Sequence, residues 1–335
     1  MFAYILRRIA LLVPVLLGLT VLVFCIGRLL PGDPVLLAAG PNASKAEVAA
    51  LATEFGLDKP IPLQYWNYLT GLLRGDWGRS LQTRGPVIDD LKVYLPATLE
   101  LVLAAMVIAV VFGIALGLLS AVYRNGALDY LTRIGSLAAI SMPRFFLGLL
   151  LQLVFAMSLG WAALGGRFPL TGSPPPTVTG LLTIDSLLAG DMGAFTLALQ
   201  HLALPAIAMS LSPLATIMRM MRSSVLEVLQ QDYVLTARAL GTPPGKLLFK
   251  HVLRNAMSAT LTVIGLYFGW LLGGTVLVET VFDWPGIGLY ATKSILAQDF
   301  MPIMGVVLAI GSMFLFFNLL VDLMYGVINP KVKLQ

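Results

Sequence analysis

The chain has 335 residues, of which 58% are hydrophobic and 12% charged, and its mean hydropathy is +0.88. Soluble globular chains carry roughly 45–50% apolar and about 25% charged residues, so the composition excludes an ordinary soluble domain and indicates a membrane protein. The net charge of +5 does not indicate nucleic-acid binding, because the basic residues stand beside apolar runs and form no single patch. Cys25 is the single cysteine, which excludes an intrachain disulfide and a cysteine-based metal cluster, and we interpret it as a packing residue.

The N-terminus resembles a signal peptide, because Arg7 and Arg8 precede an apolar stretch. That stretch, from Ile9 to Leu30, covers roughly the 20 residues needed to cross the hydrocarbon core, and no small-residue cleavage site follows it. We therefore predict a retained first membrane span.

Five further apolar stretches are each long enough to span a bilayer, which gives an all-α membrane protein with about six transmembrane helices. They run from about Leu99 to Val122, Ile134 to Leu159, His201 to Met221, Met257 to Val281 and Met301 to Val327. If the spans alternate, the Lys and Arg residues of the short flanking loops fall mainly on one side, which predicts that both termini are cytoplasmic.

Two outer segments are longer than simple loops. The segment from Pro31 to Pro96 contains a helix signal, with Ser44 and Glu47 as a capping box, an apolar face including Leu51 and a stop at Gly56, so we predict a small folded cap. The segment from Gly165 to Asp191 is rich in proline and glycine, which favours an irregular loop.

The loop between the fourth and fifth spans has a distinct pattern. Apolar residues recur at three- and four-residue intervals from Val225 to Leu240, which predicts one amphipathic helix ended by Gly241. Thr242 suits an N-cap and Pro243 the first position of a second short helix leading into span five. A helix, a glycine turn and a second helix would form a rigid docking element.

Catalytic motifs are missing from the sequence. The segment from Gly241 to Leu247, GTPPGKL, differs from a phosphate-binding loop, which needs four residues between its glycines and Ser or Thr after Lys. His201 and His251 lack the spacing of metal ligands, and no hydrolase signature is present. We expect a transport subunit without its own ATPase site, with no catalytic, cofactor-binding or metal-binding residues.

The segment from Asp232 to Met257 resembles the cytoplasmic EAA loop of binding-protein-dependent ABC permeases. Further motifs look like the dipeptide, oligopeptide and nickel permease family, and together they cover essentially the whole chain. They are LPGDPV at 30–35, GLDKP at 56–60, RGDWGRS at 74–80, LPATLEL at 95–101, ETVFDWPGIG at 279–288 and NLLVDLMYGVINPKVK near the end. The chain departs from the family pattern at Asn329, where an acidic residue is usual, and at Pro244, which follows Pro243 in the turn.

The resemblance implies a B-type permease subunit of an ABC importer in the bacterial inner membrane. Its implied partners are a homologous C-type permease subunit, two ATPase subunits that hold ATP and Mg, a periplasmic or lipid-anchored substrate-binding protein and the lipid bilayer, but no nucleic acid. The implied organisation is an N-terminal segment and first transmembrane helix (1–30), a periplasmic cap (31–97) and a core permease domain (98–335), with the EAA coupling loop at about 223–256.

The family also implies which residues couple to the ATPase subunits. The matching positions of the loop are Tyr233, Thr236, Ala237, Arg238, Ala239 and Gly241. A structural alternative is that Gly241 only caps a helix and that Arg238 only contributes to the positive-inside charge.

Three charged residues are candidates for the translocation pathway. Arg144 lies inside the third span, where an arginine costs roughly 2.5–3.5 kcal/mol on insertion scales unless it faces water or a partner. Pro143 just before it can kink this helix, which suits a channel lining. Arg144 would attract an anionic or carboxylate-bearing substrate, or alternatively snorkel to the interface or pair within the complex. Glu279 and Asp283 flank the outer end of span five, where they would tune the pathway or serve as interface residues.

Small peptides are the substrate we expect from the resemblance, with a nickel chelate or glutathione as the alternative. A secondary transporter or channel would show inverted repeats or several buried ionisable residues, and it would not need a cytoplasmic docking element. A membrane enzyme is disfavoured by the missing catalytic constellation.

Overall fold

The computed structural model describes residues 2–29, 43–54 and 58–328 of the chain. Apart from an isolated bridge between Arg79 and Pro86, the regular structure of these residues is helical. The elements are α1 (Phe2–Leu29), α3 (Lys45–Glu54), α4 (Ile61–Leu73), α5 (Val87–Val122), α6 (Ala127–Ser141), α7 (Arg144–Leu151), the π-helical η1 (Gln152–Ser158), α8 (Leu182–Leu188), α9 (Met192–Val228), α10 (Asp232–Ala239), α11 (Pro244–Lys246), the π-helical η2 (Leu247–Leu253), α12 (Arg254–Gly273), α13 (Val276–Val281), α14 (Ile287–Leu296) and α15 (Phe300–Ile328).

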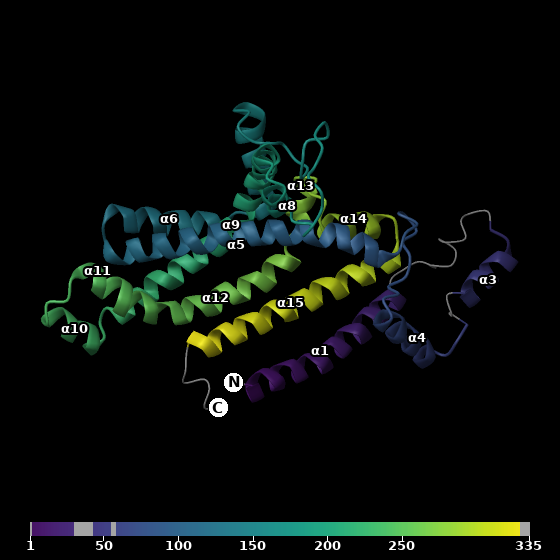
Figure 1. Ribbon diagram of the computed structural model, residues 1–335, viewed down its shortest axis with the longest axis horizontal. Coiled ribbons are helices and arrows are strands. Elements are labelled where there is room, and N and C mark those ends of the chain that lie inside the picture. Colours follow the sequence, from purple (N-terminus) through teal and green to yellow (C-terminus); the bar gives the residue numbers. More distant parts are fainter. Residues whose placement is uncertain (1, 30–42, 55–57, 329–335) are drawn as a thin grey trace.

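Five helical stretches in the described part of the chain are long and apolar enough to cross a membrane, and a sixth candidate is a bent pair. The five lie in α1, α5, α9, α11–α12 and α15, and the pair consists of α6 with α7 and η1. Figure 1 shows the five side by side, with the start of α1, the end of α15 and the α10–α11 turn toward one end, and α3, α4 and α14 toward the other. The predicted all-helical class and number of spans are therefore confirmed.

The third span, predicted from Ile134 to Leu159, is broken at Pro143, the residue expected to kink it. The chain bends by 106° between Ser141 and Arg144, and α7 leaves the bundle at a steep angle (Figure 1). Pro143 explains the break, since it lacks a backbone N–H and disfavours helical geometry in the preceding residue. Met142 accordingly has an extended backbone, with φ −87° and ψ 129°. The fifth span starts and ends earlier than predicted: it runs from Pro244 to Gly273, and Val276–Val281 form the separate helix α13.

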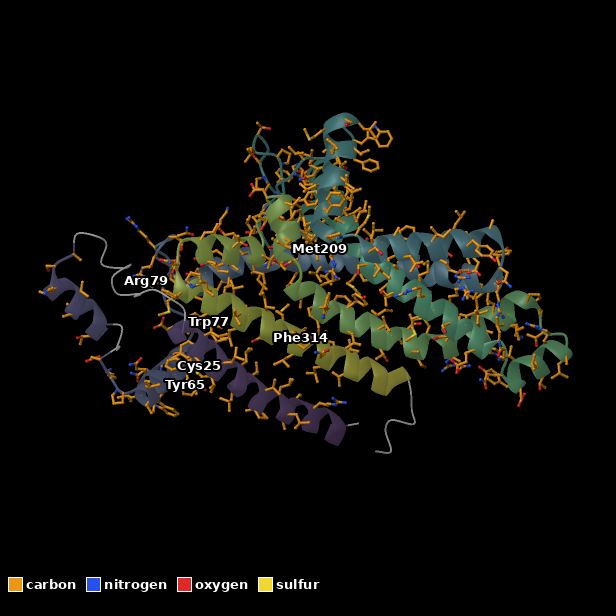
Figure 2. All side chains as sticks on the ribbon, turned by 180° about the vertical axis from the view of Figure 1, so that it is seen from behind. Cys25, Tyr65, Trp77, Arg79, Met209 and Phe314 are labelled. Carbon is orange, nitrogen blue, oxygen red and sulfur yellow. The ribbon has the colours of Figure 1, made fainter. Side chains whose placement is uncertain are left out.

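Helices α5 and α9 pack in close contact at two glycines. A Cβ atom at Gly113 would lie 2.9 Å from Cγ2 of Ile217, and one at Gly117 would lie 2.6 Å from the carbonyl oxygen of Met218. A buried cluster along the same helices includes Leu101, Met106 and Met209 (Figure 2) and continues to Leu271 of α12. Because hydrocarbon surrounds the bundle, this contact is stabilised by close van der Waals packing rather than by exclusion of water.

The cap prediction is confirmed only for its helix. Helix α3 occupies Lys45–Glu54, but the side chains of Glu47 and Leu51, and Gly56 as a whole, lie outside the described residues. Farther along, the segment that leads into α5 is fastened to α15: one carboxylate oxygen of Asp299 accepts hydrogen bonds from the Ser80 hydroxyl at 2.7 Å and from the backbone N–H of Leu81 at 2.7 Å.

A second contact fastens α14 to the same region. The hydroxyl of Tyr290 donates to Asp90 at 2.6 Å, and its ring stacks on Tyr94 with centroids 4.6 Å apart. Burial and the neighbouring Asp90 carboxylate raise the pKa of Tyr290, so the tyrosine remains a neutral donor. Residues 80–94 are thereby held against α14 and α15.

The close α5–α9 contact predicts that Gly117→Ala destabilises the chain. Forcing an extra carbon into a packed contact costs about 1–3 kcal/mol, so the detergent-purified protein should aggregate at a lower temperature than wild type. Gly18→Ala is the matched control, because a Cβ there meets no atom within 4 Å. Equal thermal stability of the two variants would contradict the packing argument.

Candidate functional site

The turn between α9 and α12 forms a projecting element that we call the elbow, residues 232–253. The prediction of one helix from Val225 to Leu240 is wrong, because α9 ends at Val228, Gln231 is extended, and α10 starts at Asp232. Val225 and Val234 are both fully buried in one apolar cluster. A straight helix would separate them by roughly 14 Å along its axis, so the chain turns back to bury both.

Gly241 makes the sharp turn of the elbow. Its φ is +76°, a conformation that L side chains rarely adopt, and its N–H donates to the carbonyl of Arg238 at 3.0 Å. The second helix starts one residue later than predicted, with Pro243 as N-cap and Pro244 in the first turn. The residue before a proline is disfavoured in helical geometry, which moves the start from Pro243 to Pro244. A Cβ at Gly241 would meet nothing within 4 Å, so the described chain leaves this turn open.

The elbow exposes most of the residues predicted for coupling. Ala237 is partly buried against the apolar cluster beneath α10, whereas the other five are exposed: Tyr233, Thr236, Arg238, Ala239 and Gly241. Two large apolar side chains lie beside them, with Leu240 81% and Phe249 63% exposed. The amide of Asn255 in α12 donates to the Tyr233 hydroxyl at 2.8 Å, which ties α10 to the following span. The elbow is thus a surface with apolar and cationic groups, fixed to α9 and α12.

An ion pair near the elbow joins three helices, and the sequence analysis did not single out its acidic member. Arg222 of α9 donates to both carboxylate oxygens of Asp129 in α6, at 2.7 and 2.8 Å. The Ser120 hydroxyl of α5 donates to the same carboxylate at 2.6 Å. Asp129 is 1% exposed, so its negative charge depends on these donors. The available signal was an acidic residue in the first turn of a helix, which by itself indicates only a helix start.

At the opposite end of the bundle, Glu279 fastens the α13–α14 hairpin to α5. Its side chain is fully buried, accepts a hydrogen bond from the Thr98 hydroxyl at 2.7 Å and accepts another from the N–H of Leu289 at 2.9 Å. The Thr98 hydroxyl in turn accepts the N–H of Ile287 at 2.8 Å. Glycine is required at 286, since a Cβ there would lie 2.5 Å from the carboxylate oxygens. The structure thus places this predicted pathway residue within a polar contact between helices.

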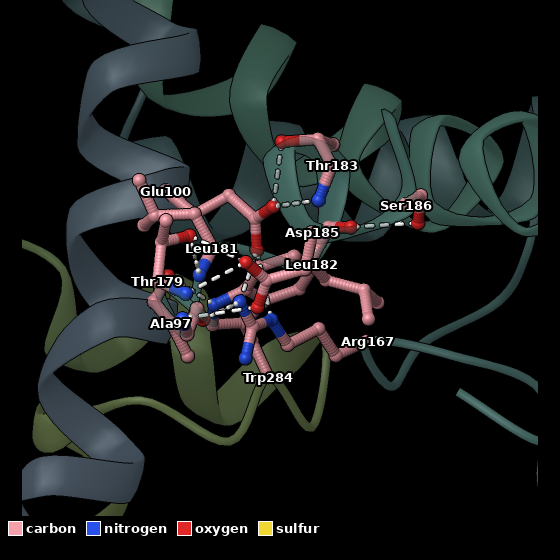
Figure 3. Close-up of polar contacts among 11 residues, drawn as sticks. Ala97, Glu100, Arg167, Thr179, Leu181, Leu182, Thr183, Asp185, Ser186 and Trp284 are labelled. Atoms are coloured by element: carbon pink, nitrogen blue, oxygen red, sulfur yellow. Dashed lines mark hydrogen bonds and ion pairs between the residues drawn. The ribbon is translucent and has the colours of Figure 1, made fainter. Parts of the chain in front are cut away.

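A second buried carboxylate organises the segment predicted as an irregular loop. Glu100 of α5 accepts two hydrogen bonds from Arg167, at 2.8 and 2.5 Å, and one from the N–H of Thr183 at 2.6 Å (Figure 3). Part of the segment forms α8, with Asp185 2% exposed. Burial raises the pKa of Asp185, but hydrogen bonds from Thr179 and Gly180 outweigh it and leave the pKa below its usual range. The loop between 165 and 191 is therefore only partly irregular.

The other two predicted pathway residues, Arg144 and Asp283, have different neighbours. Arg144 is half-buried at the break between α6 and α7, and its guanidinium carbon lies 5.5 Å from the ring centroid of Trp270 in α12. Asp283 is exposed, has φ +45°, and lines a cavity of about 520 Å³ together with Gln152, Phe168 and His201. His201 contacts the segment between η1 and α8, as its Nδ1 lies 2.9 Å from the carbonyl oxygen of Gly165.

The candidate spans, the broken helix and the projecting elbow together define a polytopic membrane protein. Residues 113–334 match the family model described as binding-protein-dependent transport system inner membrane component. Residues 1–102 match the model for the N-terminal part of such membrane components. The chain belongs to this family, and it is therefore a multi-pass inner-membrane permease component that does not itself catalyse ATP hydrolysis.

Relatives match the chain over its full length. It is 43% identical to the di/tripeptide transport system permease protein DppB of Pseudomonas aeruginosa, with 100% of both chains covered. It is 41% identical to the dipeptide transport system permease protein DppB of Alkalihalophilus pseudofirmus, covering 99% of this chain and 100% of that one. It is also 38% identical to the glutathione transport system permease protein GsiC of Salmonella typhimurium, covering 99% of both. Membership in the family implies a binding protein and ATPase subunits as partners.

The ion pair beside the elbow predicts strong coupling between Asp129 and Arg222. Asp129→Asn or Arg222→Gln alone leaves one member of a buried pair uncompensated, which costs roughly 3–5 kcal/mol, so each single variant should aggregate at a lower temperature. The double variant should be less destabilised than the sum of the singles.

The control for this cycle is the exposed pair of Asp89 and Lys92, whose side chains are 58% and 69% exposed. The same cycle at that pair should give a coupling energy of roughly 1 kcal/mol or less. Additive effects of the Asp129 and Arg222 changes would contradict the assignment.

Proposed function

We propose that the chain is the B-type permease subunit of an ABC importer that carries small peptides across the inner membrane. The observation that carries this proposal is the full-length similarity to permeases named for dipeptides and di/tripeptides, at 41% and 43% identity. The glutathione permease, at 38% identity, supports a glutathione-like tripeptide as the second candidate substrate. Both candidates have a peptide backbone and free carboxylates.

The orientation we propose places the elbow and both termini in the cytoplasm. The elbow end of the bundle carries Arg124, Arg222, Lys246 and Lys250, whereas the α13–α14 end has acidic and basic side chains with no positive excess. Positively charged loops remain on the cytoplasmic side. The elbow would then meet an ATPase subunit, which holds the ATP and Mg, and residues 31–97 would form the periplasmic cap that receives the binding protein.

Coupling in this proposal follows from the covalent continuity of the elbow with two spans. Closure of the ATPase subunits draws the elbows of this chain and of a C-type partner together, and α9 and α12 carry the displacement into the bundle. The Asp129–Arg222 pair makes α5 and α6 follow α9, so the helices turn as one body. At the far end, Glu279 keeps α13–α14 attached to α5 during this motion. We therefore propose a fastening role for Glu279 beside its predicted place near the pathway.

Arg144 is the residue we propose to meet the substrate carboxylate. Its position at a break in the third span frees backbone groups that a continuous helix would bond internally, an arrangement tolerated in membranes where the segment lines a cavity or contacts protein. Trp270 supports the guanidinium by a cation–π contact, which keeps the charge in place without neutralising it. Asp283, which lines the cavity formed with Gln152 and His201, would meet a peptide's amino group.

The proposed coupling is tested by Gly241→Asp in the complex reconstituted with its binding protein and ATPase subunits. The variant should assemble but lose the stimulation of ATP hydrolysis by peptide-loaded binding protein, because it adds a carboxylate and backbone strain at the exposed turn. Gly190→Asp is the matched control: it has φ +70° and open space around its Cβ, like Gly241, but it lies in the outer loop. Normal stimulation in the Gly241 variant, or equal loss in both, would contradict the coupling site.

The proposed carboxylate contact is tested by comparing uptake of a dipeptide in Arg144→Ala and Arg144→Lys. Uptake should fall severalfold in the alanine variant and less in the lysine variant, which keeps the charge but not the planar stacking on Trp270. Arg133→Ala is the matched control and should transport normally, because Arg133 is exposed on α6 and likewise lies over an aromatic ring, 6.0 Å from the centroid of Tyr130. Wild-type uptake in both Arg144 variants would rule out the contact.

A further inference from the structure

Helix α4 has an unusual composition for a segment between two membrane spans. Its 13 residues, IPLQYWNYLTGLL, include no charged side chain, and none of them is buried in the structure. Ile61 is 68%, Trp66 60% and Leu73 82% exposed. Leaving large apolar side chains in water forgoes roughly 1.5–3 kcal/mol for each one that could be buried, so a fully aqueous position for α4 is unfavourable.

Helix α4 contacts α1 within its membrane span rather than beyond it. The hydroxyls of Tyr65 and Thr20 are 2.9 Å apart, and the ring of Phe24 meets those of Tyr65 and Tyr68 at centroid distances of 5.5 and 5.8 Å. Figure 2 shows Tyr65 and Cys25 where the two helices meet; Cys25, which we expected to be a buried packing residue, is exposed. The apolar span of α1 runs from Arg8 to Gly27. At 1.5 Å per residue, Thr20 and Phe24 lie roughly 5–10 Å inside its end, so the contact lies at the depth of the headgroup and acyl boundary.

Helix α1, which α4 contacts, also exposes large apolar side chains, since Val13 is 55% and Leu22 is 51% exposed. The polar side chains of α4 are compatible with this position, since the Thr70 hydroxyl donates to the Trp66 carbonyl at 2.9 Å and the Gln64 amide donates to the Lys59 carbonyl at 2.6 Å. Charged residues stand on either side of the helix, namely Asp58, Lys59, Arg74 and Asp76. An uncharged helix with charges at its ends and an exposed tryptophan suits a membrane interface.

We propose that α4 is an interfacial helix that inserts Ile61, Leu63, Trp66 and Leu73 into the leaflet at the C-terminal end of α1. In the orientation proposed above this is the outer leaflet, but the placement follows from the α1 contacts and does not depend on the substrate or on coupling. The insertion anchors the middle of the 31–97 segment, where α4 lies, to the bilayer. Farther along the chain, Ser80 donates to Asp299, the residue before α15. The segment would therefore be attached both to lipid and to the bundle.

The test is spin-label accessibility in the assembled complex in lipid nanodiscs, with Cys25→Ala as background and other subunits lacking reactive cysteines. Labels are placed at Trp66→Cys and Leu73→Cys. Leu22→Cys on the exposed face of α1 is the lipid control, and Gln82→Cys in the exposed segment before α5 is the aqueous control. Both α4 labels should be severalfold more accessible to oxygen than to a water-soluble nickel chelate, as at position 22 and opposite to position 82.

Three outcomes would overturn the proposal. Greater access of the nickel chelate than of oxygen would place the α4 face in water, and loss of that access on adding binding protein would assign the face to that protein. Low access of both reagents would show that a subunit covers it. If Trp66→Cys does not assemble, Leu63→Cys probes the same exposed face, since Leu63 is 45% exposed.

Discussion

Inside a bilayer, every backbone polar group and every charge must find its partner within the protein, because hydrocarbon supplies none. The departures of this chain from simple spanning helices follow that constraint. Glu279 bonds the N–H groups at the start of α14 directly and through Thr98, and Glu100 bonds the start of α8 and Arg167. The carboxylates of α5 and α13 thus permit the chain to leave regular helix geometry near the ends of the spans without leaving donors unsatisfied.

The two ends of the bundle differ in how they are fastened. At the α13–α14 end, buried carboxylates connect α5, α13, α14, α15 and the segment before α5. At the other end the elbow is fixed by the buried Val234 and by the hydrogen bond between Tyr233 and Asn255, while Gly241 and Leu240 are exposed. A rigid far end and a projecting near end suit a lever, because displacement of the elbow is then passed on through α9 and α12 rather than absorbed in loose loops. The lipid-anchored α4 would add a fixed point beside this frame.

Predictions from local pattern succeeded where one rule acts alone. Long apolar runs located the spans, and the glycine at 241 located the turn, since only glycine readily adopts its positive φ. They failed where two rules compete. The apolar periodicity from Val225 to Leu240 predicts one helix, but burial of Val225 and Val234 in a single cluster demands a turn. In the run from Ile134 to Leu159, Pro143 by itself indicates a kink, whereas the size of the bend, 106°, is known only from the structure.

The sequence by itself determined the membrane class, the number of spans, the turn at Gly241 and, through its motifs, the permease family, because each depends on composition or on residues close together in the chain. Only the tertiary structure decided which residues bond the buried carboxylates. The bonded residues lie 67 to 181 positions apart in the chain: Asp129 with Arg222, Glu100 with Arg167 and Glu279 with Thr98. A carboxylate in an apolar run looks the same in sequence whether it faces a pathway or bonds a neighbouring helix, since its role depends on which helix packs beside it.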